Sequence, residues 1–252
     1  MLPIGSHPAL HPVSEVLGWV AGYAVFRRLR SRDGDALAEP VRWSVIAAAA
    51  VGAVVGSRLL GLAEQWPTLM AAQRSGHLLM LLASPGGKTI VGGLLGGWIA
   101  VEILKGMQHI DRRTGDLFAV PLCVGIAVGR IGCLLAGLGD GTYGNPTRLP
   151  WAVDLGDGIG RHPVQAYEIL FLLALGFLLS RNVQLPEGVR FRIFLASYLA
   201  WRVAVDFLKP QPLLGGMNVI QWTCLGALAV LALLWAKDKR FRGEAGYGRA
   251  HA

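Results

Sequence analysis

Residues 43–64, WSVIAAAAVGAVVGSRLLGLAE, form an apolar run with a single internal charge, Arg58. About 20 apolar residues are enough to cross the hydrocarbon layer of a membrane as an α-helix. The whole chain has this character, since 53% of its 252 residues are hydrophobic and only 16% are charged, against about 25% charged residues in an average soluble domain. The composition therefore argues against an ordinary soluble enzyme and excludes disorder, which requires low hydrophobicity.

Six further apolar stretches join this run, so we expect an all-α integral membrane protein with about seven transmembrane helices. The predicted spans cover 13–27, 43–64, 89–105, 117–137, 163–180, 191–208 and 218–236. The first span is short and contains Glu15, and the third is rich in glycine. We treat residues 1–252 as one membrane domain, with a transmembrane core over about 13–236 and a basic cytoplasmic tail over 237–252.

The basic residues concentrate in every second loop. Sixteen of the 24 Lys and Arg residues follow the first, third, fifth or seventh predicted span. Because Lys and Arg are retained on the cytoplasmic side, this alternation predicts seven crossings with the N-terminus outside and the C-terminus in the cytoplasm. The net charge of +8 then reflects loops that lie on an anionic membrane face, and we expect no nucleic-acid partner.

Four of the predicted spans carry charge within their apolar run, and these charges fall in the outer half of the predicted topology. They are Arg58, Arg130, Glu168, Arg202 and Asp206. A charge at such a depth costs at least about 2.5 kcal/mol on insertion scales, so it should face a partner or a wet cavity. Their convergence predicts one polar site that opens toward the outer leaflet.

Two explanations of these charges stay open. Simple ion pairing is one, since Arg202 and Asp206 are four residues apart on a helix and Glu168 could pair with Arg130 or Arg58. Three arginines against two acids nevertheless leave a surplus of positive charge, which suits an anionic ligand. Phosphate fits the fork of a guanidinium group, and the abundant phosphate group in a membrane is the phospholipid head group.

Three outer-loop residues could extend this site. Lys88 precedes the third span, where it could bind phosphate at a helix N-terminus or simply reach the interface. Asp140 lies in the Gly-rich segment 138–162, which we expect to be an ordered loop, and could orient a base or cap a turn. His162 directly precedes Pro163 and could shuttle protons or cap the fifth helix.

Small residues indicate close helix packing. Gly92 to Gly97 contains two overlapping GxxxG patterns, and Gly125 with Gly129 forms a third. Such patterns allow helices to approach closely, and packing is the favoured role for them. The three cysteines, Cys123, Cys133 and Cys224, lie in apolar stretches and are interpreted as buried packing residues.

Several of these residues resemble, in the same order, the motifs of the prolipoprotein diacylglyceryl transferase family. The matching stretches are Ser57-Arg58-Leu59, Gly86 to Gly93, Gly129-Arg130-Ile131-Gly132, Arg161 to Glu168, and the pair Tyr198 and Arg202. The most specific is RHPVQAYE at 161–168, which is close to the family pattern RHPxQxYE. The resemblance extends over about residues 15–235.

This resemblance implies a multi-pass enzyme of the bacterial plasma (inner) membrane. Its substrates would be phosphatidylglycerol, which donates its diacylglyceryl group, and a lipobox-bearing preprolipoprotein or other acceptor, whose cysteine thiol receives it. Glycerol phosphate would leave, and neither a cofactor nor a metal is expected. The implied catalytic residues are Arg202, His162 and Asp140, and the implied substrate-binding residues are Arg130, Arg58, Tyr198, Glu168, Lys88 and Gly132.

The chain departs from the family pattern at three places. Val91 occupies the position of a histidine that the family uses in catalysis, Cys133 replaces an Asn, and Ala136-Gly137-Leu138 replaces an Asn-Gly-Glu run. Lys88, Asp140 or His162 could take the place of the histidine. A non-catalytic phospholipid-binding or lipid-moving protein on the same scaffold remains an alternative. A small-anion transporter is a third possibility, although such proteins often have paired broken helices in two halves.

Overall fold

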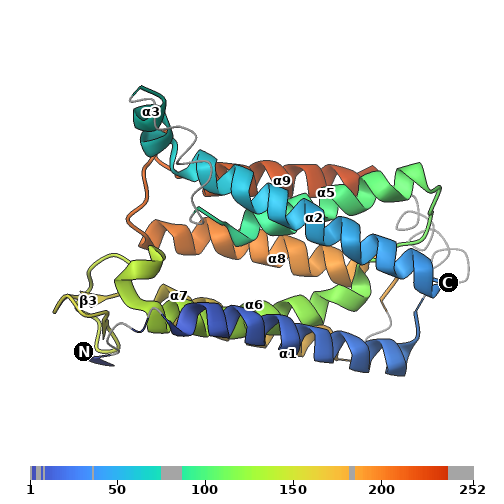
Figure 1. Ribbon diagram of the computed structural model, residues 1–252, viewed down its shortest axis with the longest axis horizontal. Coiled ribbons are helices and arrows are strands. Elements are labelled where there is room, and N and C mark those ends of the chain that lie inside the picture. Colours follow the sequence, from blue (N-terminus) through green and yellow to red (C-terminus); the bar gives the residue numbers. More distant parts are fainter. Residues whose placement is uncertain are drawn as a thin grey trace, which may run out of the picture.

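The computed structural model describes residues 2–3, 7, 9–35, 37–74, 87–181 and 185–237. Within this part, seven long helices run side by side (Figure 1). They are α1 (Leu10–Asp33), α2 (Glu39–Glu64), α5 (Ile90–Met107), α6 (Asp116–Ala136), α7 (Val164–Ser180), α8 (Val189–Val205) and α9 (Val219–Lys237). Each overlaps one predicted apolar stretch, so the helix positions are confirmed. Four of them, α2, α5, α9 and α6 with its extension to Gly139, are long and apolar enough to cross a membrane.

The helices begin where local sequence signals place their first turns. Thr89 caps α5, because its side-chain oxygen accepts a 3.1 Å hydrogen bond from the backbone N–H of Gly92, as N-cap residues do. The first turn of α8 is capped from another helix, since the Asp116 carboxylate accepts hydrogen bonds from the backbone N–H groups of Gly188 and Phe191. This cap joins the start of α6 to the start of α8.

The bundle consists of two groups of helices with α8 between them. In Figure 1, α1 and α7 lie against α6 on one side, and α2, α5 and α9 lie on the other. The backbones of α2 and α5 approach closely, because a Cβ on Gly96 would overlap the carbonyl oxygen of Gly52 and lie 2.9 Å from the Cα of Gly56. Helices pack this closely only where small residues meet.

The packing role that the sequence predicts for GxxxG glycines is confirmed for one glycine of the third pattern and wrong for the other. A Cβ on Gly125 would lie 3.0 Å from the carbonyl oxygen of Gly18 on α1, whereas a Cβ on Gly129 would meet no atom within 4 Å. Both positions look alike in the sequence. Only the crossing point of α1 and α6 distinguishes them.

The all-α expectation is confirmed for the bundle, and the structure adds one small sheet beside it. Strands β1 (Leu2–Pro3), β2 (Val153–Asp154) and β3 (Gly160–Arg161) pair in the order β1-β2-β3, parallel between β1 and β2 and antiparallel between β2 and β3. Two-residue strands are too short to show a period of two in the sequence, which is why they were missed. The segment 138–162 is an ordered loop as predicted, and the 3-10 helix η1 (Gly137–Asp140) leads into it.

Two predicted segments fall largely outside the described residues. The predicted interfacial segment begins with helix α3 (Trp66–Arg74), which has no buried side chain, but the apolar run from His77 to Ala83 is not described. The basic tail is described only at Lys237.

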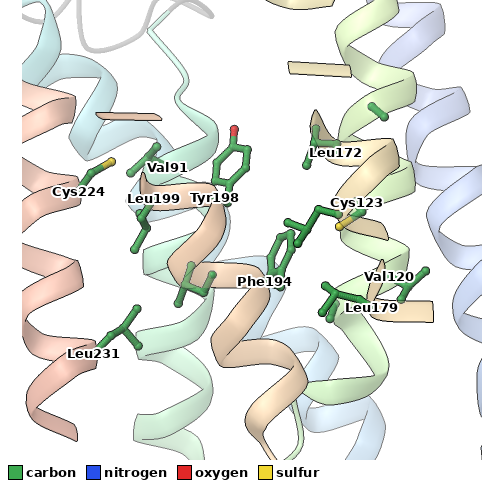
Figure 2. Packing of buried hydrophobic residues seen from close by; sticks show 14 of the residues in the cluster. Val91, Val120, Cys123, Leu172, Leu179, Phe194, Tyr198, Leu199, Cys224 and Leu231 are labelled. Carbon is green, nitrogen blue, oxygen red and sulfur yellow. The ribbon is translucent and has the colours of Figure 1, made fainter. Parts of the chain in front are cut away.

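The apolar core centres on α8. Figure 2 shows Phe194, Tyr198 and Leu199 of this helix between Cys224 on one side and Leu172, Cys123 and Leu179 on the other. These side chains are at most 6% exposed. All three cysteines are buried, as predicted. The core thus fixes the rotation of α8, and with it the direction of the polar residues at its end.

Candidate functional site

One end of the bundle collects the charged residues that the sequence placed inside the spans. At this end α2, α6 and α8 finish and α5, α7 and α9 begin (Figure 1). Arg130 lies in the last turns of α6, Glu168 in the second turn of α7, and Arg202 in the last turn of α8. The predicted convergence of these three side chains is therefore confirmed.

Glu168 is the centre of the site. Its Oε2 lies 2.9 Å from Nε of Arg130 and 3.5 Å from Nη1 of Arg202, and its Oε1 accepts a 2.6 Å hydrogen bond from the hydroxyl of Tyr198. Glu168 is 2% exposed, and none of its three partners exceeds 6%. In Figure 2 the Tyr198 hydroxyl points out of the apolar cluster. One carboxylate therefore holds two guanidinium groups and a phenol in a buried setting.

A second carboxylate continues this chain of charges beyond α8. Asp206 opens the 3-10 helix η2 (Asp206–Leu208), and its Oδ1 lies 2.8 Å from Nη2 of Arg202 and 3.1 Å from Nζ of Lys209. Its Oδ2 also lies 3.4 Å from the side-chain amide of Asn218, which donates the hydrogen bond. Asp206 and Lys209 are both buried, so the ion pairs are shielded from water.

The environment shifts the ionisation of Lys209, which follows the predicted span 191–208. Burial lowers the pKa of Lys209 to about 8, and the charge of Arg202 adds to this effect while Asp206 opposes it. The Lys209 ammonium is therefore easier to deprotonate than an ordinary lysine.

The third cation of the ion pairs differs from the one that the sequence predicts. Arg202 does pair with Asp206 and Arg130 with Glu168, but the third cation in these pairs is Lys209. Arg58 is half-buried on α2 and lies outside these ion pairs. Glu64, the last residue of α2, lies within electrostatic range of Arg130, Arg202 and Lys209. The ion pairs therefore contain three cations and two carboxylates, so the predicted surplus of one positive charge holds for the ion-paired groups.

The remaining predicted site residues are placed as follows, and their roles stay predictions. Lys88 is exposed beside Thr89 at the start of α5. His162 is half-buried, and its Nδ1 lies 3.5 Å from the hydroxyl of Tyr167. The backbone of Asp140 ends η1, but its side chain is not among the described parts. A Cβ on Gly132 would lie 2.6 Å from the Cβ of Ser14 on α1, so the visible role of Gly132 is helix packing.

Two departures from the family pattern also lie at this end. Val91 is 1% exposed and belongs to the apolar cluster, and Figure 2 shows it beside Tyr198. Cys133 is buried, and Nη1 of Arg130 lies 3.6 Å from its sulfur. Val91 therefore brings no titratable group to the site, whereas Cys133 adds a weak acceptor next to Arg130.

Sequence reasoning missed Lys209, Asn218 and Glu64. A signal for Lys209 was present, because Tyr198, Arg202, Asp206 and Lys209 follow at spacings of four, four and three residues, which places them on one helical face. No local signal marks Asn218 or Glu64, since Glu64 ends α2 and Asn218 directly precedes α9.

Two surface hollows lie at the opposite end of the bundle. One of about 520 Å³ is lined by Arg27, Arg30 and Trp43 among others, and one of about 340 Å³ by Lys105 and His109 among others. Neither touches the charged cluster. The candidate site is thus selected by its buried polar chemistry and not by the size of a cavity.

Comparisons with known proteins agree with the motifs. A family model described as prolipoprotein diacylglyceryl transferase matches residues 10–237. Three similar proteins are each called phosphatidylglycerol–prolipoprotein diacylglyceryl transferase. The one from Geobacter sulfurreducens is 32% identical over 207 residues, which cover 79% of this chain and 77% of the relative. The one from Dehalococcoides mccartyi is 31% identical over 199 residues (73% and 71%), and the one from Verminephrobacter eiseniae is 30% identical over 251 residues (90% and 88%).

Proposed function

The chain belongs to the prolipoprotein diacylglyceryl transferase family, and from that membership we propose that it transfers the diacylglyceryl group of phosphatidylglycerol to a prolipoprotein. The acceptor atom is the thiol sulfur of a lipobox cysteine. The chain is then a membrane transferase of lipoprotein biosynthesis. The family match favours this activity over the non-catalytic lipid-binding and anion-transport alternatives.

One observation in this chain supports the family activity. It is the buried group formed by Arg130, Glu168, Tyr198 and Arg202. Nε of Arg202 is buried and has no hydrogen-bond partner among the described residues, whereas Nε of Arg130 already faces Oε2 of Glu168 at 2.9 Å. Guanidinium groups that retain unused donors fit the oxygens of a phosphate group. This geometry supports Arg130 as the residue that binds the lipid phosphate and Arg202 as the residue that serves the reacting head group.

The reaction requires no covalent enzyme intermediate, because the cysteine thiolate attacks the lipid directly. The main contribution of the protein is to stabilise the charge that develops in the transition state. The cysteine sulfur attacks the glyceryl carbon that carries the phosphate, the carbon–oxygen bond breaks, and its electron pair leaves with glycerol phosphate. Positive groups that are already in place at the departing oxygen stabilise such a transition state. Glu168 holds both guanidinium groups and is itself held by the Tyr198 hydroxyl, so these groups would not need to reorganise during the reaction.

The proton of the attacking thiol needs an acceptor. Val91 cannot supply one, because a buried aliphatic side chain occupies the position of the family histidine. We assign this role to His162, with Asp140 as an orienting group and Lys88 as the alternative acceptor. Histidine is the side chain that most often acts as a general base, and Nδ1 of His162 lies 3.5 Å from the hydroxyl of Tyr167 at the edge of the outer loop.

We place the site in the outer half of a bacterial plasma membrane, with seven crossings, the N-terminus outside and the C-terminus in the cytoplasm. Supporting this topology, basic residues such as Arg27, Arg28 and Lys105 lie near the ends of α1 and α5, opposite the charged cluster. Basic ends are retained on the cytoplasmic side. An acceptor that has been exported would then meet the cluster from outside.

The test is a transfer assay with purified protein, phosphatidylglycerol vesicles and a lipobox peptide, in which mass spectrometry detects the diacylglyceryl adduct. Arg130→Lys and Arg202→Lys should each reduce the rate at least about 100-fold, because lysine keeps the charge but loses the forked donors. Arg42→Lys is the matched control. Arg42 is 1% exposed, bonds to Asp35 and the Thr114 carbonyl at the opposite end, and should retain transfer per folded molecule.

Each outcome of this assay is decisive. Adduct formation that depends on Arg130 and Arg202 but not on Arg42 supports the proposal. Protein that binds lipid but forms no adduct would point to the non-catalytic lipid-binding alternative. Full transfer by either Arg130→Lys or Arg202→Lys would refute the role assigned to that residue.

A further inference from the structure

Gln165 carries an unmatched polar atom next to the charged cluster. It lies in the first turn of α7 and is only 1% exposed. Its side-chain carbonyl oxygen, Oε1, has no hydrogen-bond partner among the described residues, and its Nε2 makes a single long contact of 3.5 Å with the hydroxyl of Thr142. Buried polar groups in proteins almost always have a partner, so this amide points to a ligand.

The position of Gln165 indicates which part of a ligand it would meet. It precedes Glu168 by three residues, and residues three apart on a helix lie on the same face. Glu168 holds Arg130 and Arg202 at 2.9 Å and 3.5 Å. Under the function proposed above these arginines bind the lipid phosphate, so the amide lies beside the phosphate and next to whatever the phosphate carries.

We propose that Gln165 binds a hydroxyl group of the donor's head group and thereby selects a lipid with a hydroxylated head group. This inference rests on the proposed function and adds its donor specificity. A hydroxyl group both donates and accepts hydrogen bonds, so it matches the amide whichever way its oxygen and nitrogen are turned. An ammonium head group can only donate, and it would bring another positive charge to Arg130 and Arg202.

Gln221 on α9 shows what a purely structural glutamine looks like in this bundle. It is also 1% exposed, but its Oε1 accepts a 2.9 Å hydrogen bond from the backbone N–H of Asn218, and its Nε2 donates a 2.9 Å bond to the carbonyl of Val203. Both ends of this amide are used within the chain. Gln221 is therefore the matched control for Gln165.

The experiment compares two donors in the transfer assay, phosphatidylglycerol and phosphatidylpropanol, in vesicles of otherwise equal composition. Both have the same phosphodiester and acyl chains, but only the first has head-group hydroxyls. The wild-type protein should prefer phosphatidylglycerol in kcat/KM by about tenfold or more, since a site built to bond a hydroxyl rejects the analogue that lacks it. Gln165→Met should bring this ratio close to one, whereas Gln221→Met should leave the ratio unchanged.

The outcomes separate this inference from the function on which it rests. If the wild-type protein uses both donors equally well, or if Gln165→Met keeps the wild-type preference, the role of Gln165 is overturned while the transferase activity stands. If the wild-type protein uses neither donor, the proposed function fails and the inference with it. If Gln165→Met does not fold, Gln165→Ala takes its place, and a wild-type preference retained by Gln165→Ala would overturn the role of Gln165.

Discussion

Replacing Glu168 by Gln tests whether the buried charges act as a unit. The substitution keeps the size of the side chain and leaves an acceptor for the Tyr198 hydroxyl, but it removes the counter-charge that lies 2.9 Å from Arg130 and 3.5 Å from Arg202. Removing one partner of a buried ion pair typically costs about 3–5 kcal/mol, because the remaining charge stays buried without compensation. Here two guanidinium groups would lose the same partner.

Thermal unfolding in detergent micelles measures this loss. For a chain of this length about 1 kcal/mol corresponds to roughly 2–4 °C, so Glu168→Gln should lower Tm by roughly 6–20 °C. Glu187→Gln is the control, because Glu187 pairs with Arg112 at 3.2 Å on an exposed surface. Such a pair contributes at most about 1 kcal/mol, and Tm should fall by less than about 4 °C.

A second measurement adds glycerol phosphate to the same thermal unfolding experiment. Glycerol phosphate should raise the Tm of Glu168→Gln more than that of the wild-type protein, because an anion that binds only the folded state stabilises it in proportion to its affinity. Equal Tm values for Glu168→Gln and Glu187→Gln would refute the reasoning, since the Glu168 carboxylate would then not stabilise the buried charges of Arg130 and Arg202.

The remaining predictions concern helix packing and pH. Gly96→Ala should destabilise the fold by about 1–3 kcal/mol, because the new Cβ would overlap the Gly52 carbonyl. Gly93→Ala is the control, since its new Cβ would lie 3.7 Å from the nearest atom, and it should change the free energy of unfolding by less than about 0.5 kcal/mol. Equal unfolding curves for the two variants would contradict the α2–α5 contact. Because the pKa of Lys209 falls from 10.5 to about 8 on folding, the unfolded chain binds more protons between these pH values. The wild-type protein should therefore gain up to about 3 kcal/mol of stability relative to Lys209→Arg from pH 8 to 10.5. Denaturant unfolding at each pH measures this gain, and a difference that stays constant with pH would show that folding does not lower the pKa of Lys209.

Local sequence signals were sufficient to predict the positions of the helices and the end of the bundle at which Arg130, Glu168 and Arg202 lie. Hydropathy acts over about 20 consecutive residues, so the apolar stretches around Arg58, Arg130 and Arg202 could be located without knowing what they touch. The order of the helices then placed Arg130, Glu168 and Arg202 at one end. The family motifs identified the same residues, because each motif is a short stretch of sequence that contains one of them.

The partner of each polar group was decided only by tertiary structure. Arg42 was counted among the loop cations, yet it is almost fully buried and bonds to Asp35 and to the Thr114 carbonyl of a distant segment. Lys209, and not the predicted Arg58, is the third cation in the ion pairs. These choices depend on the rotation and crossing of whole helices.

The sequence by itself determined which segments leave water, because transfer from water depends on the composition of each segment alone. The tertiary structure decided which buried groups are matched, because a hydrogen bond or ion pair needs two atoms within about 3 Å. Gln165 and Gln221 are the same residue in similarly apolar helices, and only the packed fold satisfies one and leaves the other with a free carbonyl.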